Sequence, residues 1–101
     1  MKTWLVWQDS NNGEDTYESF ICCAESEEDA RCMYPHNEPK FFWKEGSWCY
    51  YYRNVLYRDD GSEWVEPDDV VVELLGESNK RFPQVLLAKF RPAFVEFTKY
   101  G

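Results

Sequence analysis

The sequence predicts an α+β domain, in which about five strands form a mostly antiparallel β-sheet and one short helix follows the second strand and packs on one face. Three observations lead to this class. Runs of aromatic and β-branched residues recur along the 101-residue chain, turn-forming pairs separate them, and one segment carries a helix-start signal. The length fits one domain. We place that domain at residues 1–90, with 91–101 as a basic C-terminal tail or an extra edge strand.

The first third of the chain predicts a hairpin followed by the helix. TWLVWQ at 3–8 and DTYESFICCA at 15–24 have the composition of strands. NNG at 11–13 contains an Asn-Gly pair, which predicts a tight turn with positive φ at both centres. SEEDARCMY at 26–34 predicts a helix, because Ser26 can cap its first turn and three acids follow at once.

The rest of the chain predicts three more strands. SWCYYYRNVLY at 47–57 is the strongest strand signal, because aromatic and β-branched residues dominate it. The Asp-Gly pair in 58–63 predicts a turn. VVVELLGE at 70–77 and QVLLAKF at 84–90 complete the sheet. We expect a loop at 36–46, anchored by an aromatic side chain.

Aromatic residues carry an unusual share of the expected core. The chain has 5 Trp, 7 Tyr and 7 Phe, and each large ring can remove about 150–250 Å² from water. One short helix cannot cover a whole sheet. Some of these rings must therefore be covered by loops or by another chain, or remain exposed.

The charge is strongly negative and unevenly distributed. The net charge is −8, and residues 1–79 hold 18 acids against 6 Lys and Arg. Such a surface repels nucleic acids and anionic membranes and favours a protein partner with a basic groove. Alternatively, the charge serves solubility alone. We find no export signal or membrane-spanning run. We therefore expect a cytoplasmic protein with reduced cysteines, as a monomer or homodimer, that binds neither nucleic acid nor membrane directly.

The cysteines do not form a metal-binding pattern. Cys22 and Cys23 are adjacent in a predicted strand, so their side chains point to opposite faces. Cys32 and His36 have the spacing of one helical turn, but a proline lies between them. Cys49 is distant, and no pair of cysteines has zinc-knuckle spacing. We expect buried free thiols and no metal site.

No residue set indicates catalysis. His36 is the single histidine, no nucleophile motif surrounds it, and no Gly-rich phosphate loop is present. With 19 acids in the chain, some pair of carboxylates must come close, so any one pair carries little information. We expect a protein that is not an enzyme and holds no cofactor.

The remaining candidate is an acidic, aromatic surface at 57–69, YRDDGSEWVEPDD. Its carboxylates could steer it toward Arg and Lys side chains while the rings supply contact area. Alternatively it is a solvated loop whose aromatics, Trp64 above all, face the core. The residues expected to bind a partner are Asp59, Asp60, Glu63, Glu66, Asp68 and Asp69, with Tyr51 and Tyr57 as anchors.

The stretches NNGEDTYESFICCAESEEDAR, VVVELLGES and VLLAKF resemble those of a group of small acidic proteins encoded by bacteriophages and prophages. The resemblance spans most of residues 3–90, and the basic tail departs from it. It implies no activity or catalytic residues. It does imply an accessory protein, located in the cytoplasm of a host bacterium, that occupies a host protein.

The expected function is therefore inhibition of a host protein by a surface that mimics nucleic-acid charge. The resemblance makes a host-defence factor such as a CRISPR–Cas component a plausible target. One alternative is a small-molecule or nucleotide-binding protein with an aromatic pocket between the sheet and loop 36–46. Two others are a metal-dependent or carboxylate enzyme and a self-associating structural protein.

Overall fold

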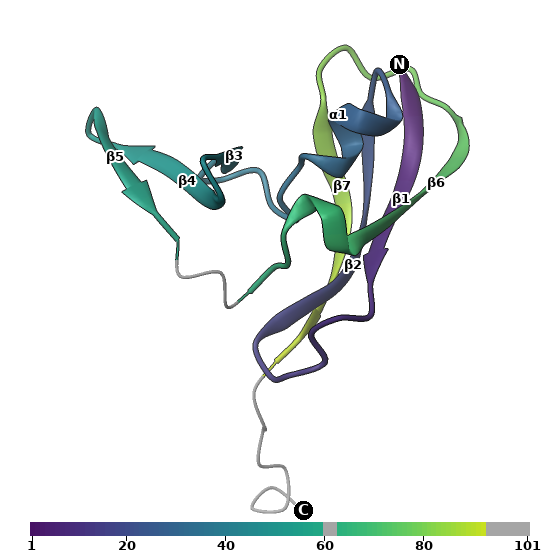
Figure 1. The fold of residues 1–101 in the computed structure, drawn as a ribbon. Helices are drawn as coiled ribbons and strands as arrows, with labels where there is room; N and C mark the ends of the chain where they lie inside the picture. Colours follow the sequence, from purple (N-terminus) through teal and green to yellow (C-terminus); the bar gives the residue numbers. More distant parts are fainter. Residues whose placement is uncertain (60–62, 93–101) are drawn as a thin grey trace, which may run out of the picture.

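A computed structural model describes residues 1–59 and 63–92, and within these ranges seven strands form two antiparallel sheets (Figure 1). The four-stranded sheet has the order β6-β1-β2-β7 and the three-stranded sheet the order β3-β4-β5. The strands of the first are β1 (Lys2–Gln8), β2 (Thr16–Ala24), β6 (Val70–Glu77) and β7 (Gln84–Arg91). Those of the second are β3 (Phe42–Lys44), β4 (Ser47–Tyr52) and β5 (Val55–Arg58).

The mostly antiparallel α+β class agrees with the sequence prediction, but a single sheet of about five strands is wrong. The expected strand at 47–57 is a hairpin, because Arg53 and Asn54 adopt positive φ angles of 50° and 64° and reverse the chain. The expected loop at 36–46 contains β3, which pairs with β4 across a second reversal at Glu45 and Gly46. Both turns lack the Asn-Gly or Asp-Gly signal.

The helix α1 (Glu27–Arg31) is shorter than the expected 26–34. Its start agrees with the prediction, since the Ser26 hydroxyl accepts a hydrogen bond from the Asp29 backbone N–H at 3.1 Å. Arg31 ends the helix and donates to the backbone carbonyls of Pro67 and Val70 at 3.2 and 2.9 Å. These bonds hold the short 3₁₀-helix η1 (Pro67–Asp69) against α1.

The β1–β2 connection is not the tight Asn-Gly turn that NNG predicts. It spans residues 9–15, and Asp15, with φ 57°, is its residue of positive φ. The buried side chain of Gln8 organises it instead. The amide oxygen accepts from the N–H groups of Ser10 and Asn11 at 2.7 and 2.8 Å, and the amide nitrogen donates to the carbonyls of Asn11 and Tyr17. One buried side chain thus replaces the expected turn geometry.

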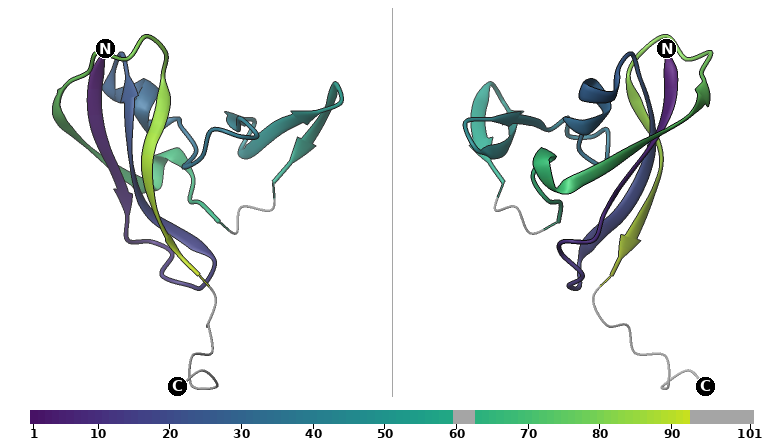
Figure 2. Two further views of the ribbon diagram at one scale, coloured as in Figure 1. Left: turned by 180° about the vertical axis from the view of Figure 1, so that it is seen from behind. Right: turned by 45° about the vertical axis from the view of Figure 1, so that its right-hand side comes forward.

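The core lies on one face of the four-stranded sheet. Val6, Phe20 and Cys22 form its floor, and Ala30 of α1 covers part of it. Figure 2 shows that α1, η1 and the three-stranded sheet all lie on this same side. The opposite face is not covered by any segment of residues 1–59 and 63–92 (Figures 1 and 2).

A row of aromatic rings connects the core to the three-stranded sheet. Phe41 stacks between Tyr34 and Tyr50, with ring centroids 4.2 and 4.8 Å away. Tyr50 stacks in turn on Tyr57 at 5.5 Å. Tyr34 is buried and Tyr57 is exposed, so the row runs from the interior to the surface of the projecting sheet.

The expected tail begins at Arg91, the last residue of β7. Residues 93–101, where an extra edge strand is the alternative prediction, lie outside the described part of the chain. In the part of the chain that is described, no helix has the length and apolar character needed to cross a membrane.

Candidate functional site: an acidic tryptophan pocket

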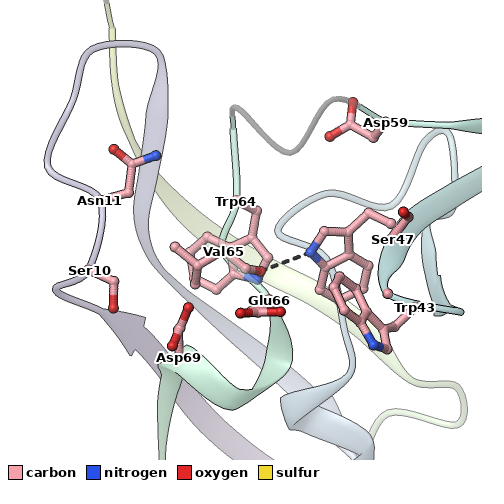
Figure 3. Close-up of a pocket in the computed structure, with 11 residues that line it drawn as sticks. Ser10, Asn11, Trp43, Ser47, Asp59, Trp64, Val65, Glu66 and Asp69 are labelled. Atoms are coloured by element: carbon pink, nitrogen blue, oxygen red, sulfur yellow. Dashed lines mark hydrogen bonds between the residues drawn. The ribbon is translucent and has the colours of Figure 1, made fainter.

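A pocket of about 380 Å³ opens between the β3–β4 hairpin, the segment that leads into β6, and the β1–β2 connection (Figure 3). We call it the acidic tryptophan pocket. Its lining residues are Ser10, Asn11, Trp43, Gly46, Ser47, Trp48, Asp59, Trp64, Val65, Glu66 and Asp69. Three of these are tryptophans and three are carboxylates, and none is Lys or Arg.

The hairpin positions two of the tryptophans. Trp43 and Trp48 are directly paired across β3 and β4, and their rings meet edge to face at 5.2 Å. The Trp48 indole N–H donates to the backbone carbonyl of Val65 at 2.8 Å, as the dashed line in Figure 3 shows. This bond joins the hairpin to the segment on the other side of the pocket.

Trp64 supplies the third indole and is fixed by the main core. Its side chain is 1 % exposed and meets Phe20 of β2 edge to face at 5.2 Å. This burial agrees with the interpretation that Trp64 faces the core. Because Trp48 and Trp64 are both buried and the Trp48–Val65 bond spans the two segments, the apolar wall of the pocket is formed before any ligand enters.

The carboxylates come from two segments. Asp59 follows β5, and its backbone N–H donates to the Trp48 carbonyl at 2.8 Å. Glu66 caps η1, where its carbonyl accepts from the Asp69 N–H at 3.0 Å. In Figure 3, Asp59 lies on the hairpin side of the pocket and Glu66 and Asp69 lie on the η1 side. The carboxylates therefore lie on both sides of the aromatic wall.

The pKa of Tyr34 reflects its burial and the negative charges near it. Its hydroxyl donates to the Asp59 carboxylate at 3.4 Å. Burial raises the pKa of Tyr34, and the charges of Asp59 and Glu63 raise it further. The phenol therefore stays protonated throughout the physiological range and remains a donor to Asp59.

The structure brings together some of the expected partner-binding residues and separates others. Asp59, Glu66 and Asp69 line the pocket. Asp68 is exposed on η1 outside the pocket lining, and Glu63 is half-buried, with its carbonyl accepting from the Tyr17 N–H at 2.9 Å. Asp60 lies outside the described residues.

The two expected tyrosine anchors lie on the three-stranded sheet rather than at the pocket. The register places Tyr57 beside Tyr50 on one face and Tyr51 beside Leu56 on the other. Both rings are exposed, and Tyr51 stacks on Phe42 at 5.6 Å. The two tyrosines therefore cannot contact one small ligand together.

Trp43 and Trp48 are two of the pocket residues that the sequence did not single out for binding. Their pairing depends on the turn at Glu45 and Gly46, where Gly46 has φ 79°. A glycine between two tryptophan-containing runs, in FWKEGSW, was the available signal for a hairpin.

All four cysteines are free. Cys22, Cys23 and Cys49 are buried and Cys32 is half-buried. Burial raises the pKa of Cys22 to about 12, with a smaller contribution from Cys23. Among the described residues, no group of three or more His, Cys, Asp or Glu side chains is arranged to hold a metal ion.

A second cavity of about 570 Å³ lies beside the expected loop at 36–46. Met33, His36, Phe41 and Lys40 are among its lining residues, with Gln84 on the β7 side. The His36 ring is half-buried and meets both Tyr34 and Phe41 edge to face, at 4.7 and 5.0 Å. This histidine is therefore part of an aromatic cluster and not a solvated loop residue.

Comparisons with known proteins return no match: no family model, no curated protein and no solved structure is significantly similar to this chain. The proposal for its function therefore depends on the chemistry of the pocket.

Proposed function

We propose that this protein is a non-enzymatic binding protein that occupies a basic site on another protein through the acidic tryptophan pocket. The observation that carries the proposal is the placement of Asp59, Glu66 and Asp69 around a wall of three tryptophans. A guanidinium or ammonium group can lie against the half-buried Trp43 ring, which the buried Trp48 and Trp64 support, while carboxylates accept its N–H groups.

The overall charge supports the same kind of partner. A net charge of −8 accelerates encounter with a positively charged groove and disfavours nucleic acid as a direct ligand. Occupying such a groove would exclude the nucleic acid that normally binds there. On the resemblance of residues 3–90 to phage-encoded proteins, we propose that the target is a host protein, with a nucleic-acid-guided defence factor as the leading candidate.

The test is binding of a fluorescent arginine-rich peptide to the full chain, followed by anisotropy. Replacing Glu66→Gln together with Asp69→Asn removes two charges at the pocket with little change in volume. We expect the affinity of this variant to fall about tenfold or more, consistent with the loss of two charge-assisted contacts.

A matched control removes two charges elsewhere. Glu25→Gln and Glu77→Gln alter exposed side chains near the end of the sheet where Lys2 pairs with Ala24 and Glu77, away from the pocket at the other end of β1. This variant should bind the peptide within about twofold of the parent. Equal losses of peptide affinity in both variants would show that net charge alone causes the effect and would contradict a function based on the pocket.

Capture from nuclease-treated bacterial lysate at low and moderate salt would then identify the target. A specific protein that is retained after nuclease treatment, is released by salt and is lost with the pocket variant supports inhibition of a host protein. Retention that disappears after nuclease treatment would contradict the proposal, because the ligand would be nucleic acid.

The second cavity favours one alternative function. Its aromatic side chains and Lys40 suit a nucleotide or a similar planar anion. Such a ligand should raise the melting temperature of the protein, and His36→Ala should remove the shift. If nucleoside mono- and triphosphates leave the melting temperature unchanged, this alternative is contradicted and the binding of a cationic partner is favoured.

A further inference from the structure

The face of the four-stranded sheet opposite the core has an apolar composition that is unusual for a solvated surface. The register places Leu87, Ile21 and Leu5 side by side across β7, β2 and β1. Trp7 and Val71 form a second pair beside this row. None of these five side chains packs against the core cluster. We call this surface the open face.

Antiparallel sheets with one solvated face normally alternate apolar and polar side chains, so that the solvated face is polar. Here Leu87 is 66 % exposed and Val71 is 42 % exposed. The open face also carries a groove of about 330 Å³ whose lining includes Leu5, Ile21 and Leu87. Its composition is that of an interface.

We propose that the open face is the interface of a homodimer, in which two copies of this chain pack sheet to sheet. The first support is the distribution of charge. The segments that carry the carboxylates of the acidic tryptophan pocket and of the first turn of α1 lie on the covered side of the sheet (Figure 2). The dimer therefore keeps these six carboxylates of each copy away from the contact.

The second support is charge complementarity within the open face. Glu73 lies at its β6 edge beside Leu5, where its carboxylate accepts from the Trp7 indole N–H at 2.9 Å. Lys89 lies at its β7 edge, where its ammonium pairs with Glu18 at 3.2 Å. Sheets packed face to face keep their strands nearly aligned. In a dimer whose two-fold axis lies between the two sheets and parallel to the strands, β6 of one copy packs against β7 of the other. Glu73 comes to lie over Leu87 and near Lys89 of the second copy, and Leu5 over Ile21.

The size of the face sets the expected strength. Four strands of seven to nine residues present roughly 450–500 Å² in projection at the usual strand spacing and rise. That area is near the lower limit of stable protein interfaces. The dimer should therefore dissociate on dilution and appear as a concentration-dependent mass.

The experiment is the molar mass of the full chain by sedimentation equilibrium over a range of micromolar concentrations. We expect the mass to rise toward twice the 12.1 kDa of one chain. Leu87→Glu introduces a carboxylate opposite Glu73 and should give a monomer. Leu74→Glu is the matched control, because Leu74 is 55 % exposed but pairs with Trp4 on the other side of the same sheet. The control should dimerise like the parent.

Leu87→Lys tests the orientation, since a cation at this position faces Glu73 of the second copy. It should weaken the dimer less than Leu87→Glu. A parent chain that stays monomeric at the highest concentration would overturn the proposal. So would equal dissociation of the Leu87→Glu and Leu74→Glu variants, and equal effects of Lys and Glu at position 87 would overturn the arrangement along the strands.

Salt dependence separates this proposal from the function of the pocket. Each copy carries −8, so added salt screens the repulsion between the exposed charges of the two copies more than it screens the contacts covered by the interface, and it should strengthen the dimer. The same salt should weaken capture of a basic partner. A dimer that is lost with salt would contradict an apolar interface, whatever the pocket binds.

Discussion

The ring of Phe41 stacks on the ring of Tyr50 with their centroids 4.8 Å apart and their planes 26° from parallel. Phe41 belongs to the loop between α1 and β3, whereas Tyr50 belongs to β4 of the projecting three-stranded sheet. The contact therefore helps to hold the hairpin that carries Trp43 and Trp48 in place at the pocket.

Replacing Phe41→Leu should lower the free energy of unfolding by about 1–3 kcal/mol, because two aromatic stacks are lost, each contributing about 0.5–1.5 kcal/mol. Urea denaturation measures the change. Phe42→Leu is the control, since Phe42 stacks only on exposed Tyr51 among the described rings. An equal or larger loss in the control would show that the row through Phe41 is not what holds the sheet.

The bond from Trp48 to Val65 predicts a second effect on stability. Trp48→Phe keeps an aromatic ring but leaves the Val65 carbonyl without this donor, so we expect a loss of about 1–3 kcal/mol in urea denaturation. Trp43→Phe should cost less, because Trp43 is only half-buried and makes no comparable bond across the pocket. Similar losses for both would argue against a special role of the Val65 contact.

Glu18 predicts a pH dependence. A hydrogen bond from Lys89 lowers the pKa of Glu18, burial opposes the shift, and Arg91 lowers the pKa further. Because the pKa is lower in the folded state, Glu18 contributes stability that is present above the ordinary value of 4.5 and is lost as the pH falls through the folded pKa.

Stability measured by urea denaturation from pH 7 down to pH 3 should therefore decline less steeply in Glu18→Gln than in the parent. Glu25→Gln, which changes an exposed carboxylate outside this ion-pair group, should keep the parental slope. If the stability of Glu18→Gln declines toward pH 3 as steeply as that of the parent, the contacts with Lys89 and Arg91 do not stabilise the fold.

The thiols should differ in reactivity under native conditions. Cys32 is half-buried, while Cys22, Cys23 and Cys49 are buried. Burial raises the pKa of Cys32, and Glu28 raises it further, so its labelling by iodoacetamide should be slow and should accelerate as the pH rises. Mass spectrometry should show a single label in the folded protein and four after unfolding. Native labelling that persists in Cys32→Ser would contradict this order.

The sequence by itself determined the elements whose signals are local. The runs at 70–77 and 84–90 form β6 and β7, with boundaries that differ from the prediction by at most one residue. A run of β-branched and apolar residues between turn-forming residues strongly favours a strand. Ser26 likewise acts as the cap of α1, since capping depends on residues only three apart.

Only the tertiary structure decided the β1–β2 connection and the pocket. Gln8 forms its hydrogen bonds because its side chain is buried at the end of β1, and this burial overrides the Asn-Gly turn preference. Trp43, Trp48 and Trp64 meet the carboxylates of Asp59, Glu66 and Asp69 because the hydrogen bond from Trp48 to Val65 joins two segments 17 residues apart. No local pattern encodes such a contact, because it depends on how the second sheet packs against the first.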